Sequence, residues 1–260
     1  MGWFLDTEEL VVTLAPLAVY WVYSGIYEVL LRRTTVLDRY RLHSTMEEKT
    51  KNIASRKDVV KGVLLQQAIQ AAISVALTSG EKGGGASTTS PAPAPAPEPF
   101  LVSAARVGVA MVVLDAWQYF MHRLMHSSPY MYRRFHSWHH RYGHPVDGVL
   151  TETLSGAAAY LASGMSPRLA AAFFAFATVK GVDDHCGVAA PWNPLHAAFA
   201  NNTAYHDVHH QRGGGRRNFS QPFFVVWDRL LGTHAAYDVR RTHGGGGGLE
   251  VKVFKNQMRA

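Results

Sequence analysis

The apolar residues of this chain are gathered into long uncharged blocks, and this feature limits its fold more than any other. Residues 10–27, LVVTLAPLAVYWVYSGIY, run for 18 positions without a charge. At that length a membrane-spanning helix becomes the default interpretation. No basic segment precedes the block, and no small-x-small cleavage site follows it before Arg32. We therefore expect an uncleaved membrane anchor and not a signal peptide.

A second and a third block extend this pattern. Residues 62–79 are again uncharged over 18 positions, although three glutamines weaken the block, and a buried helix of a soluble protein is the alternative. Residues 101–121 form the third block, which Arg106 and Asp115 interrupt. Because ionisable groups at membrane depth usually face protein or a polar cavity, we expect these two side chains to do so.

Two shorter apolar segments follow, residues 153–166 and 169–180, with Pro167 and Arg168 between them. Neither segment comfortably crosses a bilayer of about 30 Å. Together they predict a helical hairpin, which either spans the membrane on short legs or enters it partway.

Histidine is the residue that this chain uses unusually often. It has 14 histidines, and 11 of them lie between His122 and His210. Eight stand in three boxes: HRLMH at 122–126, HSWHH at 136–140 and HDVHH at 206–210. Histidines four residues apart share a helix face and can reach a common metal. Adjacent histidines diverge by about 100° on a helix, so two adjacent ligands are expected to serve two different metals.

The remaining histidines are assigned by their distance from the boxes. We expect His185 and His196, which lie between the second and third boxes, to be additional ligands. His43, His234 and His243 lie outside the cluster and are interpreted as ordinary polar residues. Metal-bound imidazoles are usually oriented by a second hydrogen bond. The candidates for that role are His144, Asp147, Asp183, Asp184 and Asp207.

Eight to ten histidine ligands are too many for one metal and suit two. The predicted ligands are His122, His126, His136, His139, His140, His185, His196, His206, His209 and His210. Imidazole fits iron, zinc, copper or nickel. A catalytic site also needs open coordination positions, which a pair of iron ions that reacts with O2 would have. We expect no catalytic side chain beyond the ligands themselves, and zinc could replace iron in a purified sample.

Basic residues predict the orientation in the membrane. Nine lysines and arginines lie between residues 32 and 61, whereas residues 80–99 hold one, Lys82. The positive-inside bias therefore places the first of these loops in the cytosol and the second across the membrane. The third span then returns to the cytosol, and the hairpin leaves and re-enters on the same side. All the clustered histidines are thereby expected near the cytosolic face.

Composition agrees with this picture. The 260 residues are 47% hydrophobic and only 17% charged, against roughly 25% charged in a typical soluble domain. The single cysteine, Cys186, excludes a disulfide framework and a Cys-rich zinc module. The predicted fold class is an all-α polytopic membrane protein with about four membrane helices, namely two spans, a third span and a hairpin. We also predict a cytosolic, histidine-rich helical domain that holds two metals.

Low-complexity segments suggest where the parts of the chain divide. Residues 81–99 are rich in glycine, serine and alternating alanine and proline, which is typical of an extended linker. We expect N-terminal membrane helices and a basic cytosolic loop over 1–79, a linker over 80–99, a catalytic domain over 100–240 and a flexible tail over 241–260.

The three boxes and the hydrophobic hairpin between the second and the third resemble the membrane fatty acid hydroxylase/sterol desaturase superfamily. Longer strings are similar to the plant sphingoid base C-4 hydroxylases within it: DDHCG at 183–187, NNTAYHDVHHQ at 201–211 and NFSQPFFVVWDRLLGTH at 218–234. The resemblance covers nearly the whole chain apart from residues 80–99 and the Gly-rich tail.

This resemblance implies a di-iron, O2-dependent monooxygenase held by the histidines above. The implied reaction is hydroxylation of sphinganine or dihydroceramide at carbon 4, which gives phytosphingosine-type trihydroxy bases. The electrons would come from NAD(P)H through a cytochrome b5-type donor. The resemblance further implies a multi-pass protein of the endoplasmic reticulum membrane with its active site toward the cytosol. It also implies a homo-oligomer or a hetero-oligomer with other sphingolipid enzymes.

Three alternatives remain at this point. The same boxes also serve sterol desaturases and methyl sterol oxidases, whose chemistry begins with the same removal of hydrogen. A histidine-rich membrane metal transporter would instead place its ligands near the bilayer midplane. The net charge of +7 alone would permit a nucleic-acid-binding module, but the apolar blocks and the lack of a recognised binding motif argue against nucleic acid as a partner.

Overall fold

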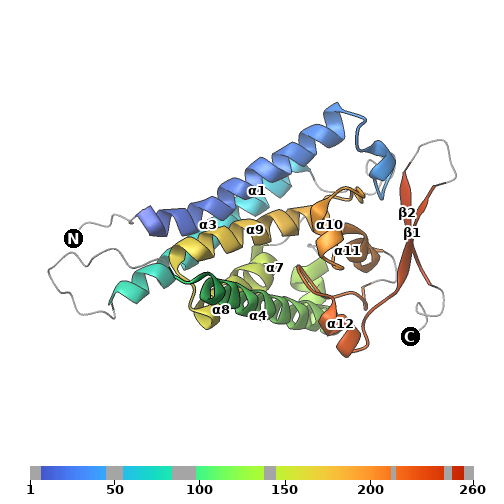
Figure 1. Cartoon of the computed structure of the whole chain (residues 1–260). Coiled ribbons are helices and arrows are strands. Elements are labelled where there is room, and N and C mark those ends of the chain that lie inside the picture. Colours follow the sequence, from blue (N-terminus) through green and yellow to red (C-terminus); the bar gives the residue numbers. More distant parts are fainter. Residues whose placement is uncertain are drawn as a thin grey trace.

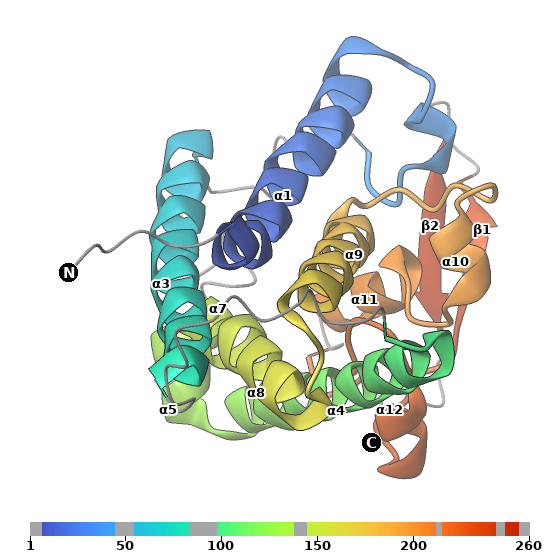
Figure 2. The ribbon, with the colours of Figure 1, turned by 60° about the vertical axis from the view of Figure 1, so that its left-hand side comes forward.

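The computed structural model describes residues 7–44, 55–83, 98–137, 145–211, 215–242 and 248–254. Within these ranges long helices make up the body of the molecule, and short helices and a pair of strands gather at one end of it (Figure 1). Figure 2 shows the same helices from another side, with α1 and α3 on one flank and α4 across the base.

Three helices of the described chain are long and apolar enough to cross a membrane: α1 (Thr7–Arg33), α3 (Arg56–Gly83) and α4 (Phe100–Ser127). They contain the three predicted blocks, which are thereby confirmed as helices. Each helix extends beyond its block, because charged residues at a helix end do not interrupt it. In α1 the acidic Glu8 and Glu9 lie in the first turn and the basic Arg32 and Arg33 in the last, where each sign suits the helix dipole.

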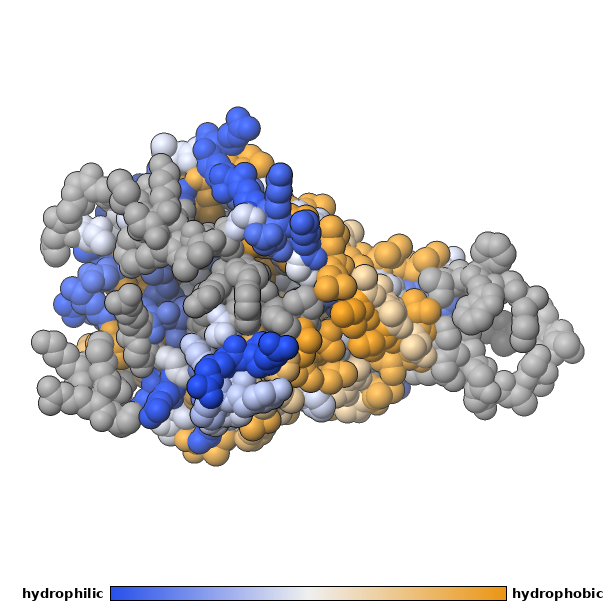
Figure 3. Space-filling model, turned by 180° about the vertical axis from the view of Figure 1, so that it is seen from behind, coloured by the Kyte–Doolittle hydropathy of each residue, from blue (hydrophilic) through white to orange (hydrophobic). Residues whose placement is uncertain are grey.

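The outer faces of these helices are apolar and exposed. Val22 of α1 is 65% exposed, Leu65 of α3 is 55% exposed and Phe120 of α4 is 51% exposed. Hydrophobic residues gather over one part of the surface and hydrophilic residues over another, as Figure 3 shows. Apolar surface of this extent marks a membrane or partner interface, and together with the three candidate spans it describes a membrane protein.

The two charged residues that interrupt the third apolar block face protein, as predicted. Asp115 is fully buried and accepts hydrogen bonds from the backbone amides of Phe223 (3.0 Å) and Phe224 (2.7 Å). Arg106 lies 3.1 Å from the carboxylate of Glu98 and also donates to a backbone carbonyl. Both charges are therefore satisfied within the protein and not in lipid.

The hairpin between the second and third boxes is also present. Its first leg consists of α7 (Pro145–Gly148), the π-helix η3 (Val149–Thr153) and α8 (Leu154–Ser163), and its second leg is α9 (Pro167–His185). Gly164 ends α8 in the left-handed region (φ 59°), and the Ser166 side chain caps α9 by accepting from the amide of Leu169. Both legs are longer than their apolar segments. Membrane insertion of the hairpin stays a prediction.

The hairpin packs into the middle of the bundle. α1 lies along α9 and α3, and α4 lies along α8. Ala110 of α4 and Ala159 of α8 are fully buried in this core, beside Leu114, Tyr160 and Phe173. These buried side chains hold α4 and α8 together in one core.

The short elements lie beyond the ends of α4 and α9. They are η1 (Asp38–Tyr40), α5 (Pro129–Met131), the π-helix η2 (Tyr132–His136), α10 (Pro194–Ala198), α11 (Thr203–His210) and α12 (Val226–Leu230). α11 packs against α9. His136 of the second box stands on η2 and the third box on α11, so this end of the molecule is the histidine-rich end.

The all-α prediction was wrong in one respect, because the chain ends in a two-stranded antiparallel sheet. β1 (Tyr237–Arg241) pairs with β2 (Leu249–Val253), and Val239 lies opposite Val251. Val251 is buried with Ala204 and Val208 of α11. The boundary predicted at residue 240 falls inside β1, and β2 lies within the predicted flexible tail. Only β2 alternates in burial, and its five residues follow a Gly-rich run that is typical of a flexible tail.

The predicted linker begins later than expected. α3 continues to Gly83, and residues 84–97 lie outside the described residues. The other domain boundaries stay predictions.

Candidate metal centre

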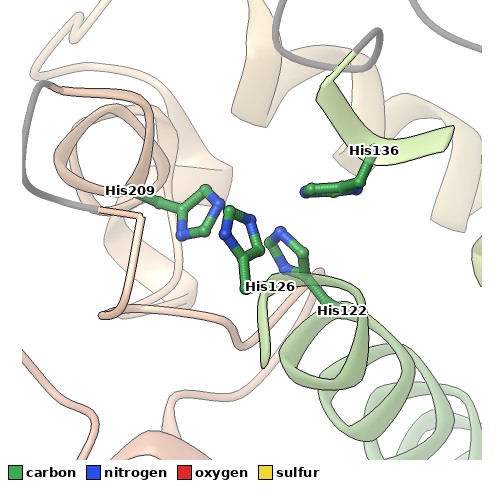
Figure 4. Close-up of side chains that lie close together, drawn as sticks. All are labelled: His122, His126, His136 and His209. Carbon is green, nitrogen blue, oxygen red and sulfur yellow. The ribbon is translucent and has the colours of Figure 1, made fainter. Parts of the chain in front are cut away.

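The first and third boxes meet the second in one cluster of four imidazoles. His122 and His126 come from the last turns of α4, His136 from η2 and His209 from α11. One ring nitrogen of each lies within 4.8 Å of the others. Figure 4 shows the four rings turned toward one another from three separate elements. His122, His136 and His209 are buried, so a metal ion at this cluster would be largely shielded from water.

A second cluster lies beside the first, on a neighbouring face of α11. It consists of His185, the last residue of α9, together with His206 and His210 of α11, again with one nitrogen of each within 4.8 Å of the others. The Nε2 atoms of His206 and His210 are 2.9 Å apart. Among the described residues both clusters contain imidazole and neither thiolate nor carboxylate, as the boxes predicted.

The adjacent histidines of the third box divide between the clusters. His209 belongs to the first cluster and His210 to the second, whereas His206 and His210, four residues apart, stay together. Successive side chains on a helix point about 100° apart, so one short helix can serve two metals from neighbouring positions. The spacing predicted that adjacent histidines would part in this way, and their service to two different metals stays a prediction.

Hydrogen bonds behind the rings fix which nitrogen faces the cluster. Nδ1 of His122 lies 2.9 Å from the carbonyl oxygen of Phe219, Nδ1 of His209 lies 2.8 Å from that of Arg217, and Nδ1 of His185 lies 2.8 Å from that of Gly181. A carbonyl only accepts, so each Nδ1 carries the hydrogen. In the neutral ring Nε2 then holds the lone pair, which is the form that binds a metal.

His136 is oriented by a carboxylate. Its Nδ1 lies 2.8 Å from Oδ1 of Asp147, and both side chains are buried. Asp147 was predicted for this role, and the structure confirms the contact. A buried carboxylate behind an imidazole also makes that ligand more basic.

The other predicted carboxylates contact different groups. Asp183 accepts from Tyr27 (2.8 Å) and from Asn193 (2.7 Å). Asp184 pairs with the buried Lys180, and Asp207 lies 2.6 Å from Nε2 of His43. Their predicted role as orienting groups for the ligands stays a prediction.

His196 lies outside both clusters. Its Nε2 is 2.9 Å from Oδ2 of Asp183, so the structure gives it an acidic partner in place of the predicted metal. The position of His196 near the boxes in sequence did not reveal its contact with Asp183.

His139, His140 and His144 lie outside the described residues, as does His243, and their predicted roles stay predictions.

The protonation of the first cluster agrees with ligation. Burial, followed by the neighbouring imidazoles, holds the pKa of His209 well below its usual value. His209 is therefore neutral at neutral pH, and a neutral imidazole is what a metal requires. The imidazoles of His122, His136 and His209, with their Nδ1 atoms engaged behind the rings, suit a divalent ion such as iron or zinc.

Sequence reasoning missed the loop that supports the first box. The buried Asp228 of α12 accepts from the amides of Phe219 (3.0 Å) and Ser220 (2.7 Å). Asn218 adopts a left-handed backbone (φ 54°), which asparagine tolerates better than most residues. Together they hold the Phe219 carbonyl behind His122. The string NFSQ carried this information, but a backbone carbonyl has no sequence signature.

A cavity of about 620 Å³ reaches the second cluster from between the long helices. It is lined by residues of α1, α3, α4 and both legs of the hairpin, and His185 lies on its wall. Asp147 lines it too, directly behind His136. The cavity therefore reaches from the level of the candidate spans to His185 of the second cluster and to Asp147 beside the first.

Two all-histidine clusters that could hold metal ions, at one end of helices long and apolar enough to cross a membrane, define the class as a membrane protein with a candidate metal centre. The chain matches the fatty acid hydroxylase family over residues 107–233, a stretch that holds both clusters. It belongs to that family.

Individual relatives are similar over almost the whole chain. The chain is 49% identical to sphinganine C4-monooxygenase 1 of Arabidopsis thaliana, covering 97% of this chain and 98% of that protein. It is 47% identical to the very-long-chain aldehyde decarbonylase GL1-9 of Oryza sativa subsp. japonica, covering 92% and 94%. It is 38% identical to the sphingolipid C4-hydroxylase of Schizosaccharomyces pombe, covering 85% and 86%. No solved structure matches.

Proposed function

We propose that this chain hydroxylates the sphingoid long-chain base, as sphinganine or dihydroceramide, at carbon 4. The observation that carries the proposal is the cavity, which leads from between the apolar helices to His185 of the second cluster. Its volume of about 620 Å³ lies within the roughly 300–1,000 Å³ of typical ligand cavities. The relatives named for C4 hydroxylation, in a plant and in fission yeast, support the same reaction.

Two iron ions are the metals we propose for the clusters. His122, His126, His136 and His209 would hold one, and His185, His206 and His210 would contribute to the other, with His139 and His140 as further expected ligands. When bound, iron supplies the activation of O2 that no side chain can provide.

The protein's own residues position the reaction. The carbonyls of Phe219, Arg217 and Gly181 and the carboxylate of Asp147 keep the imidazole lone pairs turned inward. The walls of the cavity would hold the aliphatic chain and exclude water from the carbon that reacts.

Location and electron supply form part of the same proposal. The many basic residues before α3 and the few after it support a cytosolic histidine-rich end. An endoplasmic reticulum membrane and a cytochrome b5-type donor that takes electrons from NAD(P)H fit a hydroxylase at that surface.

A second candidate is decarbonylation of a long-chain aldehyde, after the name of the rice relative. An aldehyde has one polar group, whereas a sphingoid base has an amine and two hydroxyls. The cavity wall includes Gln66, Gln67, Gln70, Ser74 and Tyr20. So many polar side chains suit the substrate that has more groups to hydrogen-bond, which favours the sphingoid base.

The test is lipid analysis of a yeast strain that lacks its own sphingoid base hydroxylase and expresses this chain. Trihydroxy bases, quantified by mass spectrometry, are expected with the intact chain and absent with His209→Ala, which removes a buried ligand of the first cluster. Sound expression without trihydroxy bases would contradict the proposal. Alkanes one carbon shorter than a supplied aldehyde would then indicate decarbonylation, and altered sterols would indicate the sterol alternative.

A further inference from the structure

The short helix α12 turns its charge inward and its apolar side chains outward. Asp228 is fully buried and accepts hydrogen bonds from amides of the loop that precedes the helix. Leu230 is 70% exposed, and Val226 and Leu231 are exposed too. A helix on the surface of a soluble protein has the opposite arrangement, with its apolar stripe toward the core. The outer face of α12 therefore needs an apolar partner.

This outer face adjoins the apolar outer face of α4. The ring of Trp227 in α12 lies 5.6 Å from that of Phe120 and 6.4 Å from that of Tyr119. Phe120 and Leu124 of α4 are themselves exposed. Figure 1 shows α12 beside the end of α4 that carries the first histidine box. Exposed apolar side chains thus continue from the candidate span onto α12.

The contact lies where α4 is expected to leave the bilayer. Phe100, the first residue of α4, and Phe120 are separated by about 30 Å along the helix axis. That length matches the hydrocarbon core of a bilayer, which is about 30 Å thick. Tryptophan is enriched at the boundary between this core and the headgroups. Trp117 of α4 and Trp227 of α12 both lie near that level.

Basic side chains flank the exposed residues of α12. Arg229 is exposed within the helix itself. Arg217 donates to the carbonyl of Gly232 at 3.1 Å, beside the exposed Leu231. Apolar side chains next to arginines are typical of a segment that lies in the membrane interface. There the apolar groups enter the acyl boundary, and the cations are attracted to anionic headgroups.

We propose that α12 and Leu231 are immersed in the membrane interface beside α4, with the phospholipid bilayer as their partner. Val226, Leu230 and Leu231 lie among the upper parts of the acyl chains, and Arg229 lies at the headgroup phosphates. The proposal concerns a surface outside the cavity, so it is independent of the substrate.

Lipid on this face would support the first cluster from outside. Asp228, on the inner face of α12, accepts from the amide of Phe219 at 3.0 Å. The carbonyl of Phe219 lies 2.9 Å from Nδ1 of His122. The bilayer on one face and this loop on the other therefore confine α12 between them.

The experiment measures how deeply Leu230 lies in lipid. In a full-length Cys186→Ser background, which removes the single native cysteine, Leu230→Cys is labelled with an NBD fluorophore. The protein is placed in nanodiscs of phosphatidylcholine and phosphatidylserine. A nitroxide high on the acyl chain is expected to quench the label more than one near the chain end, because an interfacial segment enters the boundary by about 5–10 Å. Iodide in the water is expected to quench it at least about threefold less than the same label on Lys252→Cys, an exposed position of β2.

Two further labelled positions make the result independent of one variant. Val226→Cys lies one helical turn before Leu230 on the same face, and it is expected to give the same pattern. Val22→Cys, on the exposed apolar face of α1, is the reference for a residue that faces lipid. It is expected to be quenched by nitroxide lipid and shielded from iodide.

Either of two results would overturn the inference. In the first, iodide quenches the labels on α12 as strongly as the label on β2, which would place α12 in water. In the second, the labels are shielded from iodide but neither nitroxide lipid quenches them. Another protein surface, such as a second copy of this chain, would then cover α12 in place of the bilayer.

Discussion

At the scale of single residues, the groups behind the imidazoles decide how the imidazoles act. Three of the cluster histidines donate Nδ1–H to backbone carbonyls, and His136 donates to Asp147. The carboxylate could be predicted from the sequence because aspartate near a histidine box is a recognisable residue. The carbonyls could not, because every residue has one and only the fold selects which of them lies behind a ring.

The contact between Asp147 and His136 leads to a prediction about metal affinity. Asp147→Asn replaces an acceptor that fixes the Nδ1–H form with an amide that can also donate. We expect metal affinity at the first cluster to fall by about 10–100-fold, measured as metal retained per chain against a series of chelator concentrations. Asp238→Asn, in an exposed ion pair of β1, is the matched control, and equal retention in both variants would count against this role for Asp147.

His196 offers the opposite prediction. Because it pairs with Asp183 and lies outside both clusters, His196→Ala should keep the wild-type number of metals per chain. It should still lower thermal stability by about 1–3 kcal/mol, since the fully buried Asp183 loses a partner. Elemental analysis and thermal unfolding measure the two effects. Loss of a metal from His196→Ala would restore the ligand role first expected for this residue.

At the scale of elements, α11 is the part of the fold on which both clusters depend. It presents His209 to one cluster and His206 and His210 to the other. Its support comes from the C-terminal sheet, where Val251 packs on Ala204 and Val208. Gln211 adds a hydrogen bond from its amide to the Val251 carbonyl at 3.1 Å. The sheet is therefore a structural support for the third box.

This support can be tested by placing a charge on each face of β2. Val251→Asp buries a carboxylate against α11, and we expect a loss of stability of about 2–3 kcal/mol together with lower metal content. Lys252→Asp introduces the same side chain at the next position, where the lysine is exposed, and it should change neither property appreciably. Unchanged metal binding in Val251→Asp would separate the sheet from the metal centre.

Helices were predictable from this sequence and the sheet was not. An uncharged run such as residues 10–27 dictates a helix because lipid leaves no other partner for the backbone. β1 and β2 have only five residues each, and their pairing depends on contact with α11, which no local pattern records. The helical extension of α3 to Gly83 was missed for a related reason, because glycine in the last turn resembled the start of the linker.

At the scale of the whole molecule, the apolar helices form one part of the structure and the candidate metal centre lies at one end of them. α1, α3 and α4 carry exposed apolar faces, and the histidines lie at one end, where α4 and α9 finish. A lipid could thus enter the cavity from the bilayer without crossing water. The clustering of His122, His126 and His209 was predictable because box spacing reports helix geometry. The contact of His196 with Asp183 was not, because tertiary packing selects it.

The orientation of the whole chain leads to a topology prediction. In a Cys186→Ser background, Ser55→Cys, just before α3, is expected to react with an impermeant maleimide added to the cytosolic side of sealed microsomes. Ser90→Cys, in the segment after α3, is expected to react only once the membrane is opened. The reverse labelling pattern would place the histidine-rich end on the lumenal side of the membrane. A cytosolic electron donor could then not reach the metal centre.

The central claim is that the two histidine clusters hold two metal ions. Elemental analysis of the purified full-length protein, summing iron and zinc so that exchange during purification does not matter, tests it most directly. We expect about two metals per chain in the wild type, fewer in His136→Ala and fewer in His185→Ala, which belong to different clusters. One metal per chain in the wild type, or none, would contradict the claim.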